Sequence, residues 1–142
     1  KIFRWDGKAL QPLADLSGLT VFCLSDGIVD AQDRLYVGAI GYNFFDPANQ
    51  PVHTCVITCI AADGSARVVA KDLSFPNGMA ITPDGKTLYV CDINDKKTYR
   101  FAIQADGALA DRALYCEIGA DGSFAIAGLP PGPSAKNWRT RS

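Results

Sequence analysis

The sequence predicts an all-β fold, a partial (about half) β-propeller of four-stranded antiparallel blades. Windows of about 11 residues with apolar side chains at i, i+3, i+4 and i+7 are absent, which argues against helices. Asp-Gly pairs at 6/7, 63/64, 84/85 and 106/107 lie between apolar runs, as they do in β-hairpins. The strand and turn segments also repeat after about 40 to 55 residues, which is the period of propeller blades.

The apolar runs and the turns that bound them define the expected strands. In chain order these cover residues 2–5, 9–14, 27–29, 34–39, 52–61, 66–71, 79–82, 87–91, 98–104 and 113–117. The first two form a hairpin around the first Asp-Gly pair. The stretches "DGIVDAQDRLYVG" and "NGMAITPDGKTLYVC" then align as an apolar strand, a polar turn and a Leu-Tyr-Val strand, each followed by a further hairpin. The chain is therefore expected to hold two full blades after a leading hairpin.

These elements predict one half-propeller domain of about 2.5 to 3 blades over residues 1–127 and an irregular, flexible tail over residues 128–142. Three prolines, Pro130, Pro131 and Pro133, exclude a central strand from the tail. A half ring leaves two blade faces without a neighbour, although blades are stabilised by burying those faces. We therefore expect a homodimer, or a second polypeptide that supplies the remaining blades.

The composition favours a soluble globular protein that binds small molecules. Apolar residues make up 48% of the chain and charged residues 20%. The 14 basic and 15 acidic side chains nearly cancel, so no net field attracts nucleic acid or an anionic membrane. No apolar run approaches the roughly 18 residues of a membrane span. The five cysteines form no C-x-x-C pair and are interpreted as reduced thiols of a cytoplasmic protein.

Asn77 is the first candidate for a functional residue. Pro76 stiffens the chain before it and Gly78 permits a tight turn after it, so the amide of Asn77 is held in place. An amide oxygen held in this way is a neutral ligand for a hard cation such as Ca²⁺, although an Asx-turn is an alternative role. Asp26 and Asp121 also precede glycine at related positions, and equivalent positions of successive blades point toward one central channel.

Other chemistries have little support in the sequence. His53 is the only histidine, and no G-x-S-x-G elbow is present, so serine-hydrolase chemistry is not expected. The sequence also lacks a glycine-rich phosphate-binding motif and a metalloprotease motif. Oxygen ligands around a divalent cation are the chemistry that the residues favour.

Three stretches carry a family resemblance. "SDGIVDAQDRLYVGAIGYNFF", "FPNGMAITPDGKTLYVCD" and "FAIQADGALADRALYCEIGADG" resemble, in this order, the senescence marker protein / gluconolactonase / luciferin-regenerating enzyme family. The likeness covers roughly residues 1 to 122, as in a truncated or half-size member. It implies a six-bladed propeller with one divalent cation in the channel, Ca²⁺ first and Zn²⁺, Mn²⁺ or Mg²⁺ as alternatives, and hydrolysis of lactones and esters. By resemblance, Asn77 is a metal ligand and Asp121 is both a ligand and a general base.

The chain also departs from the family pattern. Ser25 precedes Asp26 where the family has an asparagine, the N-terminal blade with its glutamate ligand is absent, and the W-V-A stretch after Asp121 is replaced. The resulting hypothesis is a metal-dependent lactone or ester hydrolase with Asp121 and Asp26 as catalytic residues and with Ser25 and Asp92 in contact with the substrate. A non-catalytic half-propeller that binds or serves as a scaffold is the alternative, and a strictosidine-synthase-like condensing enzyme is a weaker third.

Overall fold

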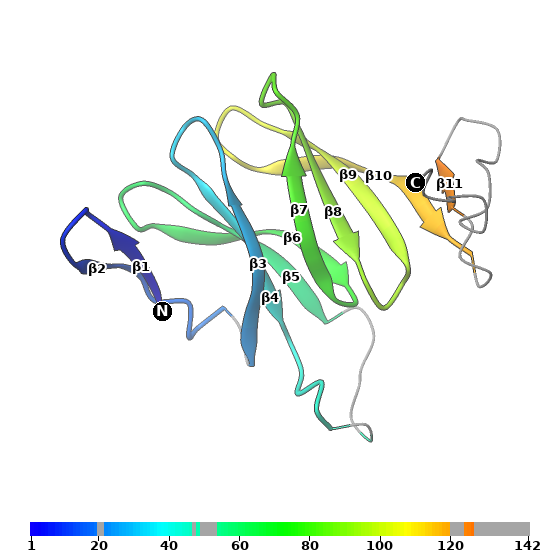
Figure 1. Cartoon of the computed structure of the whole chain (residues 1–142), viewed down its shortest axis with the longest axis horizontal. Coiled ribbons are helices and arrows are strands. Elements are labelled where there is room, and N and C mark those ends of the chain that lie inside the picture. The colour runs from blue at the N-terminus through cyan, green and yellow to red at the C-terminus, as the bar shows by residue number, and fades with distance from the viewer. Residues whose placement is uncertain (20–21, 47, 49–53, 120–123, 127–142) are drawn as a thin grey trace, which may run out of the picture.

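The computed structural model describes residues 1–19, 22–46, 48, 54–119 and 124–126 and shows an all-β fold (Figure 1). Its strands are β1 (Ile2–Trp5), β2 (Leu10–Ala14), β3 (Cys23–Val29), β4 (Leu35–Ile40), β5 (Cys55–Ile60), β6 (Ala66–Leu73), β7 (Pro76–Ile81), β8 (Thr87–Asp92), β9 (Lys97–Ile103), β10 (Leu109–Ile118) and β11 (Phe124–Ile126). Within the described residues, no helix has the length and apolar character needed to cross a membrane.

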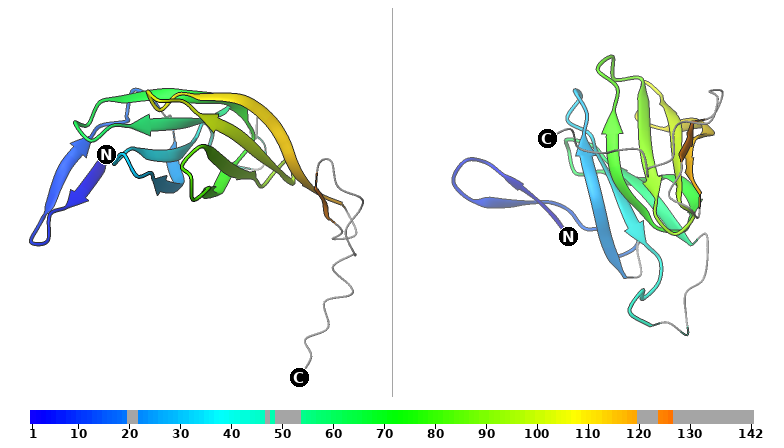
Figure 2. Two further views of the ribbon diagram at one scale, coloured as in Figure 1. Left: turned by 90° about the horizontal axis from the view of Figure 1, so that it is seen from above. Right: turned by 45° about the vertical axis from the view of Figure 1, so that its right-hand side comes forward.

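The strands form two antiparallel blades and a separate hairpin. The first blade has the order β3-β4-β5-β6, and the second has the order β7-β8-β9-β10 with β11 added beside β10. Strands β1 and β2 pair only with each other. Figure 2 shows the blades as an arch, with β3 and β7 on its concave side and β6 and β10 on its convex side. The predicted partial propeller of four-stranded antiparallel blades is confirmed.

Two apolar cores hold the arch together. The larger core lies between the two blades and includes Tyr36, Ile57, Leu88 and Phe101, which are at most 3% exposed. The smaller core is built on Leu16 and on side chains from the opposite face of the first blade, and the hairpin β1–β2 packs against it. The middle strands of the first blade, β4 and β5, are therefore buried on both faces, which accounts for the run of buried residues along β4.

The observed strands follow the expected ones, with differences at bulges. Strand β10 begins at Leu109 rather than at residue 113, because the backbone of Asp111 adopts a positive φ of 52° and the register shifts there without ending the strand. Strands β3 and β7 likewise begin before the expected residues 27 and 79. The short strand β11 was not among the expected strands. The predicted tail over residues 128–142 lies outside the described residues.

Candidate functional site

The inner strands β3 and β7 carry the candidate site on the concave side of the arch (Figures 1 and 2). They belong to different blades but run next to each other. Each strand contains a register irregularity at its polar residue followed by glycine. The irregularity lies between Leu24 and Gly27 in β3 and between Asn77 and Met79 in β7. Bulges of this kind redirect side chains near functional sites. The two blades therefore present their irregular, polar positions side by side.

Ser25 joins the two inner strands. Its hydroxyl donates a hydrogen bond of 2.5 Å to the carbonyl oxygen of Pro76, 51 residues further along the chain. Gly38 of the neighbouring strand leaves the space for this contact, because a Cβ atom there would overlap the Ser25 hydroxyl and would lie 2.9 Å from the Pro76 carbonyl oxygen. Ser25 therefore fixes the position of the residue directly before Asn77.

Asp26 and Asn77 meet at one backbone N–H group. The amide N–H of Gly78 points to the Asp26 Oδ2 atom at 3.1 Å and to the Asn77 Oδ1 atom at 3.0 Å. Because both oxygens lie within hydrogen-bond distance of the same nitrogen, a carboxylate and an amide oxygen from two blades are brought close together. Asp26 is exposed and Asn77 is partly buried. We call these two residues the Asp26–Asn77 pair.

A buried carboxylate positions the start of β7. Asp92 is fully buried, and its two oxygens accept hydrogen bonds from the backbone N–H groups of Ser74, at 2.8 Å, and Phe75, at 2.7 Å. The hydroxyl of Ser74 donates to Asp95 at 2.7 Å. These bonds fix the chain that enters β7. Asp92 thus orients the segment that carries Asn77, and contact of Asp92 or Ser25 with a substrate stays a prediction.

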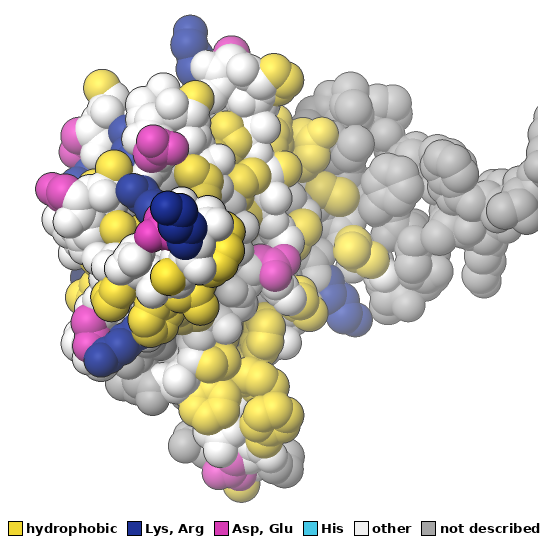
Figure 3. Space-filling view, turned by 60° about the vertical axis from the view of Figure 1, so that its left-hand side comes forward, with side chains coloured by type: hydrophobic (Ala, Val, Ile, Leu, Met, Phe, Trp, Pro, Cys, Tyr) yellow, Lys and Arg dark blue, Asp and Glu magenta, His cyan; other side chains and the backbone are white. Residues whose placement is uncertain are grey.

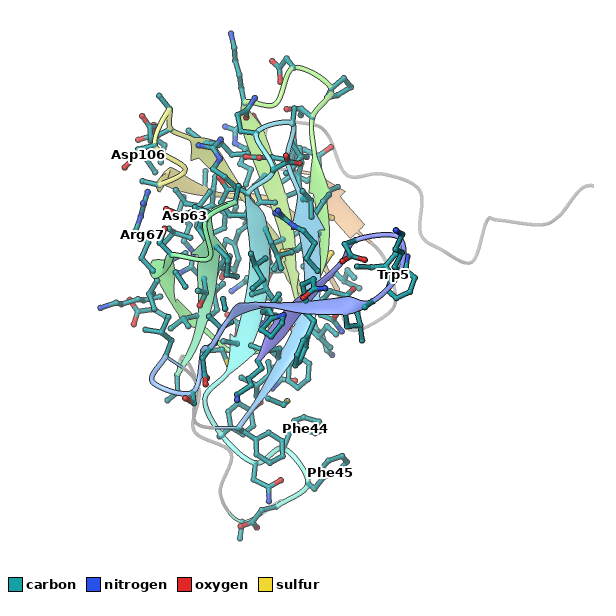
Figure 4. All side chains as sticks on the ribbon, turned by 90° about the vertical axis from the view of Figure 1, so that its left-hand side faces the viewer. Trp5, Phe44, Phe45, Asp63, Arg67 and Asp106 are labelled. Carbon is teal, nitrogen blue, oxygen red and sulfur yellow. The ribbon has the colours of Figure 1, made fainter. Side chains whose placement is uncertain are left out.

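Aromatic side chains form one end of the site. The ring of Phe75, two residues before Asn77, lies 5.4 Å from the ring of Phe44, which in turn contacts Phe22 at 5.4 Å and Phe45 at 4.4 Å. Figure 4 labels Phe44 and Phe45 on the loop that follows β4, and Figure 3 shows hydrophobic side chains gathered on the same lobe. Phe45 is 77% exposed. An apolar surface therefore adjoins the polar pair.

The donor set of the Asp26–Asn77 pair suits a hard cation. Carboxylate and amide oxygens are ligands of Ca²⁺ and Mg²⁺, whereas Zn²⁺ sites use mainly His and Cys. Two oxygens are fewer than the six to eight that surround Ca²⁺. Among the described residues, no group of three or more His, Cys, Asp or Glu side chains lies together. Asp121, predicted as a further ligand and as a base, lies outside the described residues, as does His53.

Sequence reasoning identified Asp26 and Asn77 but did not connect them through Gly78. The signal for that connection is a glycine inside a strand, because glycine at such a position often marks a bulge. The hydrogen-bonded network behind the site, in which Asn94 donates to the Tyr42 hydroxyl at 2.7 Å and Tyr42 to the Ser74 carbonyl at 3.3 Å, had no recognisable signal. Its members are distant in sequence and meet only in the fold.

Comparisons with known proteins give both a family and a fold. The family model described as SMP-30/Gluconolactonase/LRE-like region matches residues 1–130. A solved luciferin-regenerating enzyme shares 16% identity with a TM-score of 0.64, over 87% of this chain and 47% of that one. Regucalcin from Agrobacterium tumefaciens, described as a calcium-binding protein, shares 21% with a TM-score of 0.59, over 82% and 42%.

A gluconolactonase from Xanthomonas campestris is also similar in structure. It shares 25% identity with a TM-score of 0.52, over 71% of this chain and 39% of that one. This chain therefore spans less than half the length of each of these three solved structures.

Proposed function

Because the chain belongs to the SMP-30/gluconolactonase/LRE-like family, we propose that it takes part in the metal-dependent hydrolysis of small lactones or esters at the Asp26–Asn77 pair. The convergence of two oxygens from different blades on the Gly78 N–H group carries this proposal. The similarity to a gluconolactonase and to a calcium-binding protein supports it.

The residues of the pair have separate roles in the proposed site. Asn77 contributes its amide oxygen to a divalent cation, Ca²⁺ in the first place, with Asp121 as the second ligand that the family resemblance implies. A bound cation supplies polarisation of the ester carbonyl. Asp26 is exposed beside Asn77, so its carboxylate is open to water and to substrate.

The proposed reaction is an addition followed by an elimination. A water molecule adds to the carbonyl carbon and gives its proton to the Asp26 carboxylate. The bond between that carbon and the ring or ester oxygen then breaks, and the departing oxygen takes the proton from Asp26. Ser25 joins the strands β3 and β7 that carry the two residues, and Asp92 fixes the chain that enters β7.

Calorimetry and a lactonase assay test the proposal. The chelator-treated protein is titrated with CaCl₂, and hydrolysis of gluconolactone is followed with EDTA and after Ca²⁺ is restored. We expect heat of binding, loss of hydrolysis with EDTA and recovery with Ca²⁺. No heat and no metal-dependent hydrolysis would refute the proposal and would favour a non-catalytic binding or scaffold module.

Substitutions distinguish the roles of the two residues in the Asp26–Asn77 pair. Asn77→Ala removes the amide oxygen and should abolish both Ca²⁺ binding and hydrolysis, whereas Asp26→Asn should reduce hydrolysis more than binding. Asp63→Asn removes the same charge at an exposed turn and serves as the matched control, which should behave as the wild type. Full metal-dependent activity in Asn77→Ala would refute the assignment of the site.

A further inference from the structure

Three hairpins of the chain have related Asp-Gly turns. The glycines Gly7, Gly64 and Gly107 have similar positive φ angles of 95°, 86° and 85°. The hairpins belong to β1–β2, β5–β6 and β9–β10 and so to three successive blade positions. The chain therefore presents the same structural unit three times.

Two of these turns dock on the preceding unit. The turn after β9 is held by the first blade, where Arg34 donates to the Ala105 carbonyl at 2.8 Å and Arg67 donates to the Asp106 carbonyl at 2.6 Å. The hydroxyl of Tyr36 donates to the Gly107 carbonyl at 3.2 Å.

The turn after β5 lies against the hairpin β1–β2, where a Cβ atom on Gly64 would overlap the Leu13 carbonyl oxygen. Figure 4 labels Asp63, Arg67 and Asp106 on this edge. Each docked turn thus rests on the unit that precedes it in the chain.

The third turn, at Asp6 and Gly7, has no preceding unit among the described residues. The hairpin that carries it exposes an apolar face: Phe3 is 49% exposed, Trp5 is 61% exposed and Leu10 is 63% exposed. Trp5 pairs with Leu10 across the hairpin, so their side chains share one face. The opposite face, with Ile2 and Leu13, packs against the first blade. Figure 4 shows Trp5 on the hairpin, away from the two blades.

The second blade offers the matching surface. Tyr89 pairs with Arg100 in this blade as Tyr36 pairs with Cys59 in the first blade, and a Cβ atom on Gly107 would lie 3.3 Å from the Cys59 sulfur. Arg100 therefore occupies the position that a docked turn contacts.

Among the described residues, no element covers this surface of the second blade, and the surface carries a cation that forms no ion pair with them. A hollow of about 220 Å³ lies here, lined by Thr87, Arg100, Phe101, Ala102 and Asp111. Arg100 is exposed, and no carboxylate of the described residues lies within ion-pair distance of it. The neighbouring Tyr89 stacks edge to face on Tyr115 at 4.6 Å. Tyrosine and arginine are the residues that interface cores favour.

We propose that the hairpin β1–β2 of one copy docks on the free face of the second blade of another copy. Trp5 lies against Arg100 and Tyr89 in this contact, and the Asp6-Gly7 turn covers the hollow. A tryptophan ring attracts a guanidinium group, and the Asp6 carboxylate adds a complementary charge. This contact between two chains is of the same kind as the contacts that the turns at Gly64 and Gly107 make within one chain.

A second copy is the occupant because each copy carries both surfaces. Two docked copies form two equivalent contacts related by a twofold axis, so the assembly closes without further copies. This inference does not depend on hydrolysis, and its test measures mass alone.

Light scattering after size-exclusion chromatography tests the docking across a dilution series. The wild type should approach twice its chain mass of 15.2 kDa at high concentration. Trp5→Ser and Arg100→Glu should each weaken association by about tenfold or more, as expected for residues at an interface centre. Lys71→Glu makes the same change of charge at an exposed position of β6 and should not alter the mass. Circular dichroism confirms that each variant is folded.

Mixing the variants gives the decisive result. Trp5→Ser retains an intact blade surface, and Arg100→Glu retains an intact hairpin, so a mixed pair has one unaltered contact where each variant alone has none. The mixture should therefore associate more strongly than either variant alone. A wild type that stays at 15.2 kDa at every concentration, or a mixture that associates no better than its components, would overturn the proposal.

Discussion

Replacing Asp92 with alanine should strongly destabilise the protein. Asp92 is fully buried and accepts the backbone N–H groups of Ser74 and Phe75, at 2.8 and 2.7 Å. Alanine leaves both donors without an acceptor, and a buried unsatisfied donor costs about 1 to 3 kcal/mol. The free energy of unfolding should therefore fall by about 2 to 5 kcal/mol, a large part of the roughly 5 to 15 kcal/mol typical of a domain.

Urea unfolding followed by circular dichroism measures this loss. Asp92→Asn keeps one acceptor oxygen, so we expect about half the loss of the alanine variant. Asp63→Ala is the control and should change little, because Asp63 lies at an exposed turn, where its carboxylate accepts the Ser65 N–H group at 2.9 Å. An Asp92→Ala loss below about 1 kcal/mol would refute the reasoning, because the two donors would then have found other partners. The same change should weaken Ca²⁺ binding at Asn77 in the folded protein.

Three further predictions concern other buried positions. Burial raises the pKa of Tyr36 to about 12 from its usual value of 10, so its contribution to stability is complete below pH 10. Roughly 3 kcal/mol of this contribution should be lost as the pH rises from 10 through 12. Urea unfolding at alkaline pH measures the loss, and the Tyr36→Phe variant should not show it. Burial also raises the pKa of the Cys55 thiol, so at pH 8 a disulfide reagent should modify the exposed Cys91 and leave Cys55 unmodified until the protein unfolds. Gly38→Ala should lower the free energy of unfolding by about 1 to 3 kcal/mol, because the added methyl group meets the Ser25 hydroxyl and the Pro76 carbonyl; an unchanged urea midpoint would contradict this contact.

Local patterns in the sequence were sufficient to predict the blades. The Asp-Gly turns between apolar runs specify hairpins, and Gly7, Gly64, Gly85 and Gly107 all adopt the positive φ that such turns require. The aligned Leu-Tyr-Val strands specified the repeat, and the structure places them at equivalent positions in the two blades. These features depend on neighbours within a few residues, which a sequence displays directly.

The site could be predicted only in part, because its geometry depends on contacts between blades. Asp26 and Asn77 were recognised as candidate oxygen ligands, but their common partner, the Gly78 N–H group, results from bulges whose positions no local pattern fixes. Asp92 was predicted to contact the substrate, yet the same residue pattern suits an exposed loop or a buried acceptor. Only the folded structure, in which the N–H groups of Ser74 and Phe75 donate to the Asp92 carboxylate, shows that Asp92 is a buried acceptor.

The two blades are fastened to each other at both margins of the arch. Ser25 binds the Pro76 carbonyl on the concave side, and Arg34 and Tyr36 bind the Ala105 to Gly107 turn on the convex side. Attachments this far apart resist rotation of one blade against the other, so the spacing between the Asp26 and Asn77 oxygens varies little. If the proposed cation binds at Asn77, this rigid scaffold, rather than a loop, would set the width of the space beside it and so the preference for one alkaline-earth ion over another.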